Sequence, residues 1–169
     1  MKTFKMMPRF GFFYTRFPAW CPVLALVALC GIGAPQAARG QMHLAGGTAW
    51  GRGGTGLAAE VGMRRPVGEG GRVALGAAIT AGDAGAHFGA AEARVEFRID
   101  PAAAFAPFVA LGAGVLSEPE ALRAVWSLSL GLAPRIGAGR RLRLAGAWSR
   151  SDGAAGPYRV LMGVEFTAR

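Results

Sequence analysis

Residues 91–99 have the sequence AEARVEFRI, in which side chains of two kinds alternate without a break. The even positions carry Glu92, Arg94, Glu96 and Arg98, whereas the odd positions carry only Ala, Val, Phe and Ile. Successive side chains of a β-strand point to opposite faces, so this repeat predicts a strand with one charged and one apolar face. In an α-helix, charges two residues apart would be scattered around the axis.

The same alternation recurs along the rest of the chain, between turns that are rich in Gly, Asp and Pro. Seven such turns leave eight segments, most of them about nine to eleven residues long, the length of a tilted transmembrane strand. Alanine-rich helices are the alternative, but each glycine inside a segment would cost a helix interior roughly 1 kcal/mol. The pattern therefore predicts an all-β fold, an eight-stranded antiparallel up-and-down transmembrane β-barrel. The other seven segments are 42–50, 56–64, 72–80, 105–116, 125–133, 141–149 and 158–167.

Charged residues within the predicted strands share the face opposite the large apolar residues. The lumen of an eight-stranded barrel is just wide enough for side chains to fill, and buried charges need partners. We therefore predict that the charged face lines the lumen as an ion-pair network, and Arg72, at the start of 72–80, has the same parity. The apolar face suits lipid, where a charge at mid-bilayer would cost roughly 2–4 kcal/mol. The predicted network consists of Glu60, Arg64, Glu92, Arg94, Glu96, Arg98, Arg141, Arg143, Arg159 and Glu165.

Aromatic residues concentrate near the ends of the predicted strands. If the barrel begins on the periplasmic side, as outer-membrane barrels generally do, every tryptophan and tyrosine after residue 41 falls at the outer rim. Amphipathic aromatic residues at both interfaces form the girdles of membrane barrels. The predicted outer girdle is Trp50, Trp126, Trp148 and Tyr158, and the inner girdle is Phe97, Phe105 and Phe166.

The first forty residues differ from the rest, because a basic start is followed by 22 residues without a charge, 17–38, and then by small residues. This order predicts a secretory signal peptide over 1–40 and a barrel domain over 41–169. An uncleaved membrane helix and a lipoprotein anchored through Cys30 are alternatives. Cleavage would remove five of the 19 basic residues and no acid, lowering the net charge from +9 to +4 and removing both cysteines. We therefore expect neither a nucleic-acid partner nor a disulfide framework.

From residue 41 onward, the chain resembles the small OmpA/OmpX-type outer-membrane β-barrels in strand number, dyad pattern and chain end. In that family, the last strand carries a glycine, alternating apolar residues and an aromatic residue near the terminus, which the barrel-assembly machinery recognises. Gly163, Phe166 and Ala168 match this spacing, whereas Leu161 stands where a polar residue is usual and Arg169 ends the chain in place of an aromatic residue. The resemblance implies an outer-membrane location, and we expect a monomer in contact with outer-membrane lipid.

Few residues offer catalytic chemistry. The two histidines, His43 and His87, are predicted at opposite ends of the barrel and are interpreted as solvated rim or loop residues. No cluster has zinc-site spacing and no glycine-rich segment matches a phosphate-binding loop, so no cofactor, metal or catalytic residue is assigned. We expect a non-enzymatic protein with a structural or minor transport role. The alternatives are an outer-membrane lipid-modifying enzyme and an exported soluble lipocalin-like barrel that binds a small apolar ligand.

Overall fold

The computed structural model describes residues 40–119, 121–151 and 154–167. The predicted signal peptide, apart from Gly40, lies outside these residues, as do Ala168 and Arg169 of the predicted assembly signal. No helix in the described part of the chain is long and apolar enough to cross a membrane.

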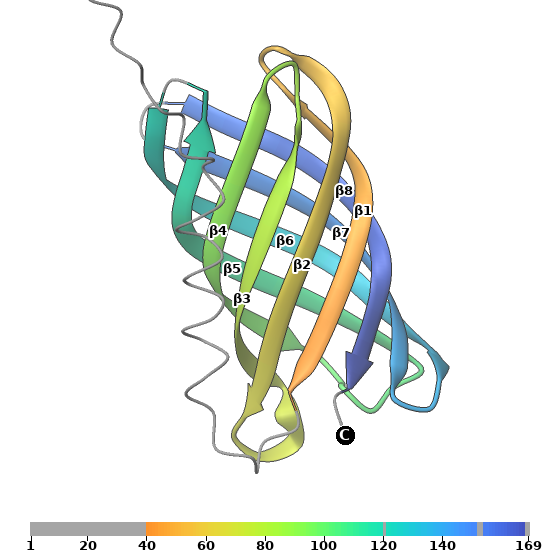
Figure 1. Ribbon diagram of the computed structural model, residues 1–169. Helices are drawn as coiled ribbons and strands as arrows, with labels where there is room; N and C mark the ends of the chain where they lie inside the picture. Colours follow the sequence, from red (N-terminus) through yellow and green to blue (C-terminus); the bar gives the residue numbers. More distant parts are fainter. Residues whose placement is uncertain (1–39, 120, 152–153, 168–169) are drawn as a thin grey trace, which may run out of the picture.

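Eight antiparallel strands form one closed barrel, in which each strand pairs with its neighbours in sequence and β1 pairs with β8 (Figure 1). The predicted eight-stranded antiparallel barrel is thus confirmed. The strands are β1 (Gln41–Gly51), β2 (Gly54–Val67), β3 (Val73–Asp83), β4 (His87–Arg98), β5 (Phe105–Glu118), β6 (Ala121–Gly137), β7 (Arg140–Ser151) and β8 (Ala154–Thr167). A short 3₁₀ turn, η1 (Glu69–Gly71), lies between β2 and β3.

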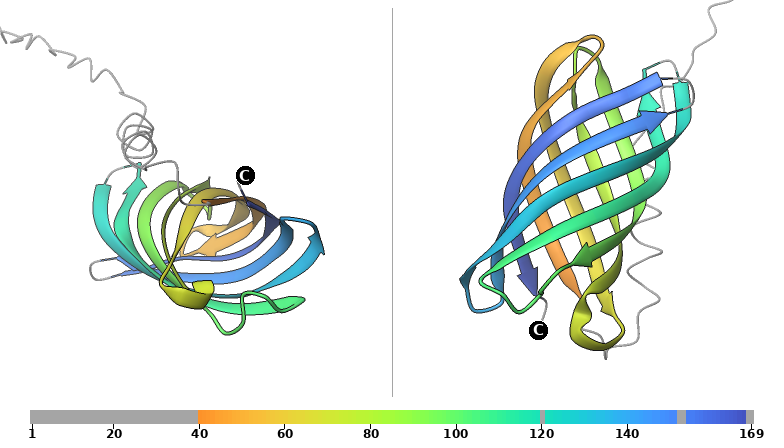
Figure 2. Two further views of the ribbon diagram at one scale, coloured as in Figure 1. Left: turned by 90° about the horizontal axis from the view of Figure 1, so that it is seen from below. Right: turned by 180° about the vertical axis from the view of Figure 1, so that it is seen from behind.

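The two ends of the barrel differ in their connections. The end where β1 begins and β8 finishes is called the terminal end here, and the opposite end is the loop end (Figures 1 and 2). The loop-end connections are shorter than the alternation predicts, because the strands extend further toward them. His87, predicted in a turn, is the first residue of β4, and β6 begins at Ala121 rather than near Trp126.

The barrel is apolar outside and charged inside. Large apolar side chains point outward along all eight strands, and Leu57 is the most exposed of them at 77%. The inward-facing Arg and Glu side chains of β2, β4 and β8 are 1–8% exposed. A soluble barrel would show the opposite arrangement, so the surface is that of a protein whose solvent is lipid.

The lumen also holds large apolar side chains, which the sequence analysis did not predict. A buried cluster of alanines with Phe88, Leu116, Val125 and Leu161 fills the lumen toward the loop end. Segment 105–116 carries no charge, so its sequence does not indicate which of its two apolar faces points into the lumen. Leu161, which departs from the family pattern, belongs to this cluster and is 2% exposed.

Arg72 does not share the lumen face. β2 runs to Val67 and pairs there with Val73, so the three glycines of the connection, all with positive φ, form a tight turn that leaves Arg72 exposed ahead of β3. Glycine adopts this left-handed backbone without the steric cost that other residues meet. The prediction for Arg72 was wrong because the turn, rather than the strand period, sets its direction.

Candidate functional site

The buried charges of the lumen form two separate groups. The first, called the Glu60 cluster, contains Glu60, Glu92, Arg94 and Arg159. Arg94 donates to both oxygens of Glu60, at 2.9 and 2.8 Å, and to Glu92 at 2.9 Å. Thr80 also donates to Glu60, and Ser127 also donates to Glu92. Two Arg and two Glu make this cluster neutral.

The second group, called the Glu165 cluster, contains Arg64, Glu96, Arg98, Arg143 and Glu165. Glu165 pairs with Arg98, lies 2.9 Å from Arg64 and 3.7 Å from Arg143. Glu96 lies 3.0 Å from Arg64, 2.7 Å from Arg98 and 2.9 Å from Arg143. Each carboxylate therefore meets the same three guanidinium groups, and the cluster carries three positive charges against two negative ones.

An aromatic ring faces the excess positive charge of the Glu165 cluster. The guanidinium carbon of Arg143 lies 4.0 Å from the ring centroid of Phe108, and that of Arg98 lies 5.8 Å from it. The negative face of an aromatic ring attracts a cation, most strongly where water is excluded. Gly131 makes room for this ring, since a Cβ atom there would overlap the Phe108 ring and the carbonyl oxygen of Leu144.

We predict that Gly131→Ala destabilises the barrel, because the added methyl group meets fixed backbone as well as the Phe108 ring. The expected loss in the free energy of unfolding is roughly 1–3 kcal/mol, measured by urea titration in lipid vesicles. Gly146→Ala on the adjacent strand is the matched control, because no atom of the described residues lies within 4 Å of the Cβ position there. Equal midpoints for the two variants would contradict the close packing at Gly131.

Arg141 does not join the predicted ion-pair network. Its guanidinium donates to the carbonyl oxygens of Pro101, Ala103 and Ala133, and no carboxylate among the described residues pairs with it. Glu165, its cross-strand neighbour, is engaged by Arg64 and Arg98 instead. The connection between β4 and β5 brings its carbonyl groups to Arg141, so hydrogen bonding at the terminal end replaces the predicted ion pair. The structure brings the other nine predicted residues together in the two clusters.

The two histidines have different surroundings. His43, interpreted as a solvated residue, is 4% exposed in the lumen, with Nε2 3.0 Å from Glu60 Oε1. Gly62 opposite it leaves space for the ring. No charge in β1 marks its inner face, so the sequence carried no signal for this position. His87 is exposed at the loop end, with Nδ1 3.5 Å from Asp83.

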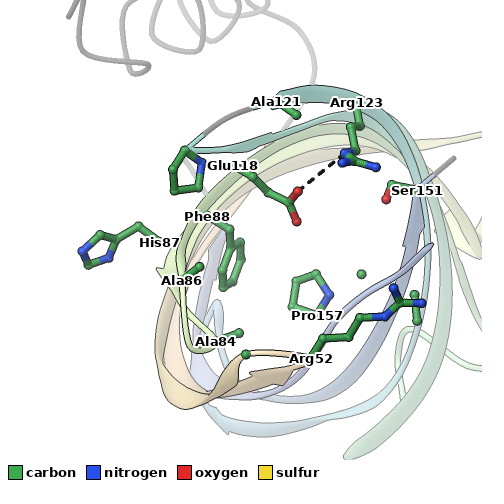
Figure 3. Close-up of a pocket in the computed structure, with 15 residues that line it drawn as sticks. Arg52, Ala84, Ala86, His87, Phe88, Glu118, Ala121, Arg123, Ser151 and Pro157 are labelled. Carbon is green, nitrogen blue, oxygen red and sulfur yellow. Dashed lines mark ion pairs between the residues drawn. The ribbon is translucent and has the colours of Figure 1, made fainter. Parts of the chain in front are cut away.

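Neither histidine forms the arrangement expected of a lipid-modifying enzyme. Within the described part of the chain, no serine is hydrogen-bonded to His43 or Glu60, and both face the lumen rather than the membrane. His87 points away from the barrel axis (Figure 3). No group of three or more His, Cys, Asp or Glu side chains in the described ranges could hold a metal ion.

A cavity of about 490 Å³ forms the mouth of the barrel at the loop end. Figure 3 shows the ring of Phe88 and Pro157 inside this mouth, with Glu118 and Arg123 paired on one side of its rim. The carboxylate of Glu118 lies 3.6 Å from Arg123, and both side chains are about 40% exposed, so water reaches this pair. Phe88 also belongs to the apolar cluster of the lumen, which closes the cavity below.

The predicted girdle residues all lie on the outer surface. Trp50 and Tyr158, paired across β1 and β8, stack with ring centroids 6.1 Å apart. Trp126 and Trp148, on β6 and β7, meet edge to face with centroids 4.7 Å apart. The strands β6–β8 extend beyond these rings toward the loop end. Phe97, Phe105 and Phe166 lie near the terminal end and are 46, 66 and 44% exposed.

Solved structures of several β-barrels are similar to this chain. Neisserial surface protein A (NspA) matches with a TM-score of 0.59 and 10% identity, over 76% of this chain and 96% of that one. The N-terminal β-barrel domain of Pseudomonas aeruginosa OprF matches with a TM-score of 0.58 and 10% identity, over 79% and 100%. A designed transmembrane β-barrel matches with a TM-score of 0.53 and 12% identity, over 80% and 100%.

No protein-family model and no curated protein matches the chain. At 10–12% identity the likeness is one of fold. The charged lumen, the lipid-facing exterior and these neighbours together identify the chain as an eight-stranded antiparallel transmembrane β-barrel.

Proposed function

We propose that this protein is a structural, non-enzymatic outer-membrane barrel whose lumen is closed to solutes. The observation that carries the proposal is the burial of the lumen charges. All nine Arg and Glu side chains of the Glu60 and Glu165 clusters are at most 8% exposed. A continuous aqueous channel would expose such charges to water, as the mouth exposes Glu118 and Arg123.

Apolar side chains close the lumen further. The alanine-rich cluster with Phe88 and Leu116 lies below the mouth, and Phe108 packs with three alanines in a second buried cluster. An eight-stranded barrel has just enough interior for its own side chains. A lumen filled by side chains supports a structural role rather than a minor transport role.

Export and membrane insertion complete the proposal. The basic, apolar and small segments of 1–40 support export by a signal peptide. The outward-facing Phe166 supports recognition by the barrel-assembly machinery, and we propose a monomer. The outer membrane is the proposed location because an outward-facing apolar band around a polar interior is characteristic of outer-membrane barrels.

The test is fractionation of cells that express the full chain, combined with gel mobility before and after boiling. We expect the protein in carbonate-washed outer membranes, with a heat-dependent mobility shift that reports a closed barrel. In planar bilayers the purified protein should show no steady conductance. Recovery as a soluble periplasmic protein without a shift would overturn the membrane placement, whereas steady conductance steps would favour the transport role.

A further inference from the structure

A groove on the outer surface of the barrel lies at the terminal end, across β3 to β6. Its volume is about 690 Å³, within the range of roughly 300–1,000 Å³ that is usual for ligand pockets. Phe97, Ile99 and Leu130 border it and are 46, 73 and 55% exposed, so they face the surroundings of the barrel rather than its core. Val109 lies between them on β5. These side chains form an apolar wall that faces the membrane, and Arg98 and Phe108, which are buried in the lumen, also belong to the lining.

One exposed basic residue, Arg72, is among the residues that line this groove. The backbone of Arg72 is held in place because the Arg98 N–H donates to its carbonyl oxygen at 2.7 Å. Among the described residues, Arg72 forms no ion pair. Asp100, an acidic residue on the neighbouring turn, does not pair with Arg72. Its carboxylate accepts hydrogen bonds from the N–H groups of Ala102 and Ala103.

The surrounding surface is also basic. The exposed and part-exposed positions of the strand ends and turns at the terminal end carry five Arg and two acids within the described residues, a net charge of +3. Charge of one sign gathered in this way attracts anions to the rim. The residues counted are Arg65, Arg72, Arg135, Arg140, Arg141, Glu69 and Asp100.

We propose that the groove holds one glycerophospholipid, with an acyl chain along Phe97, Ile99 and Val109 and its phosphate on the guanidinium of Arg72. A guanidinium offers two parallel N–H donors that match phosphate oxygens, which makes this contact stronger than one between neutral groups. The inference rests on the proposed membrane placement. A phospholipid of the leaflet at the terminal end is favoured over an acidic polymer because this exposed cation adjoins an apolar groove.

The test measures lipid retention by native mass spectrometry of the full chain, purified in mild detergent. The probe is phosphatidylglycerol with palmitoyl and oleoyl chains, added at increasing ratios to protein. We expect wild-type protein to retain one lipid at low ratios, and Arg72→Gln to bind it on the order of tenfold more weakly. Arg65→Gln, exposed at the same end but outside the groove, should behave like wild type.

A second pair of variants tests the groove without changing charge. Val109→Trp fills it and should weaken retention, whereas Leu111→Trp, on the same strand face but outside the groove, should not. Diacylglycerol with the same acyl chains lacks the phosphate group. Wild-type protein should therefore bind diacylglycerol only as weakly as the Arg72→Gln variant binds phosphatidylglycerol.

The results distinguish a failure of the lipid site from a failure of the membrane placement. Equal retention by wild type and Arg72→Gln, or by Val109→Trp and Leu111→Trp, would overturn the lipid site. The same samples are run on gels before and after boiling. A mobility shift without selective retention would reject the lipid site alone, whereas a soluble protein with no shift would reject both.

Discussion

Glu165→Gln should lower the free energy of unfolding by about 3–5 kcal/mol, because it leaves buried guanidinium groups without their partner. Among the residues that the structure describes, Glu165 and Glu96 are the carboxylates that pair with Arg64, Arg98 and Arg143, so the cluster would change from a net charge of +1 to +2. The amide retains the size of the carboxylate but not its charge. Urea titration in lipid vesicles, with folding followed by gel mobility, measures the loss.

Two further variants separate charge from shape. Glu69→Gln removes a carboxylate from the exposed turn between β2 and β3 and should change stability by less than about 0.5 kcal/mol. Adding Arg98→Met to Glu165→Gln returns the cluster to +1 and should recover part of the loss. A single Glu165→Gln variant as stable as wild type would show that the pairing of Glu165 contributes nothing to the folded barrel.

Met162→Arg should cost roughly 2–4 kcal/mol, because it places a charge on the lipid face near the middle of the bilayer. Met162 is 60% exposed and lies on the same face of β8 as Tyr158 and Phe166, halfway between them in sequence. If those rings mark the two interfaces, Met162 is at the greatest distance from water. The same vesicle titration measures the change.

Thr55→Arg is the control for this variant, because Thr55 is exposed and pairs with Trp50 at the loop end of the barrel. A charge near the interface should cost only about 0–1 kcal/mol. A soluble lipocalin-like barrel makes a different prediction, since an outward Arg at residue 162 would then meet water. Equal stability of Met162→Arg and wild type would therefore count against the membrane placement.

For several strands, the sequence predicts which face points into the lumen, because each of these strands carries charged residues that cannot face lipid. In β4, four alternating charges define the inner face, and in β8 Arg159 and Glu165 do the same. The prediction failed locally where another constraint acts. Arg72 follows the glycine turn, and Arg141 is engaged by carbonyl groups of a connection that lies 38–40 residues away in sequence.

The sequence by itself determined the strand number, the up-and-down order and the outward position of the bulky apolar residues that alternate with charges, because a period of two and the cost of a charge in lipid are local properties. Only the tertiary structure decided which Arg meets which Glu and how His43, Phe108 and Arg72 are placed. Four Glu and five Arg could pair in many ways, and the choice depends on how the tilted strands are staggered around the barrel. In β1 and β5, where no charge marks a face inside the strand, pairing with charged neighbours selects the inner side.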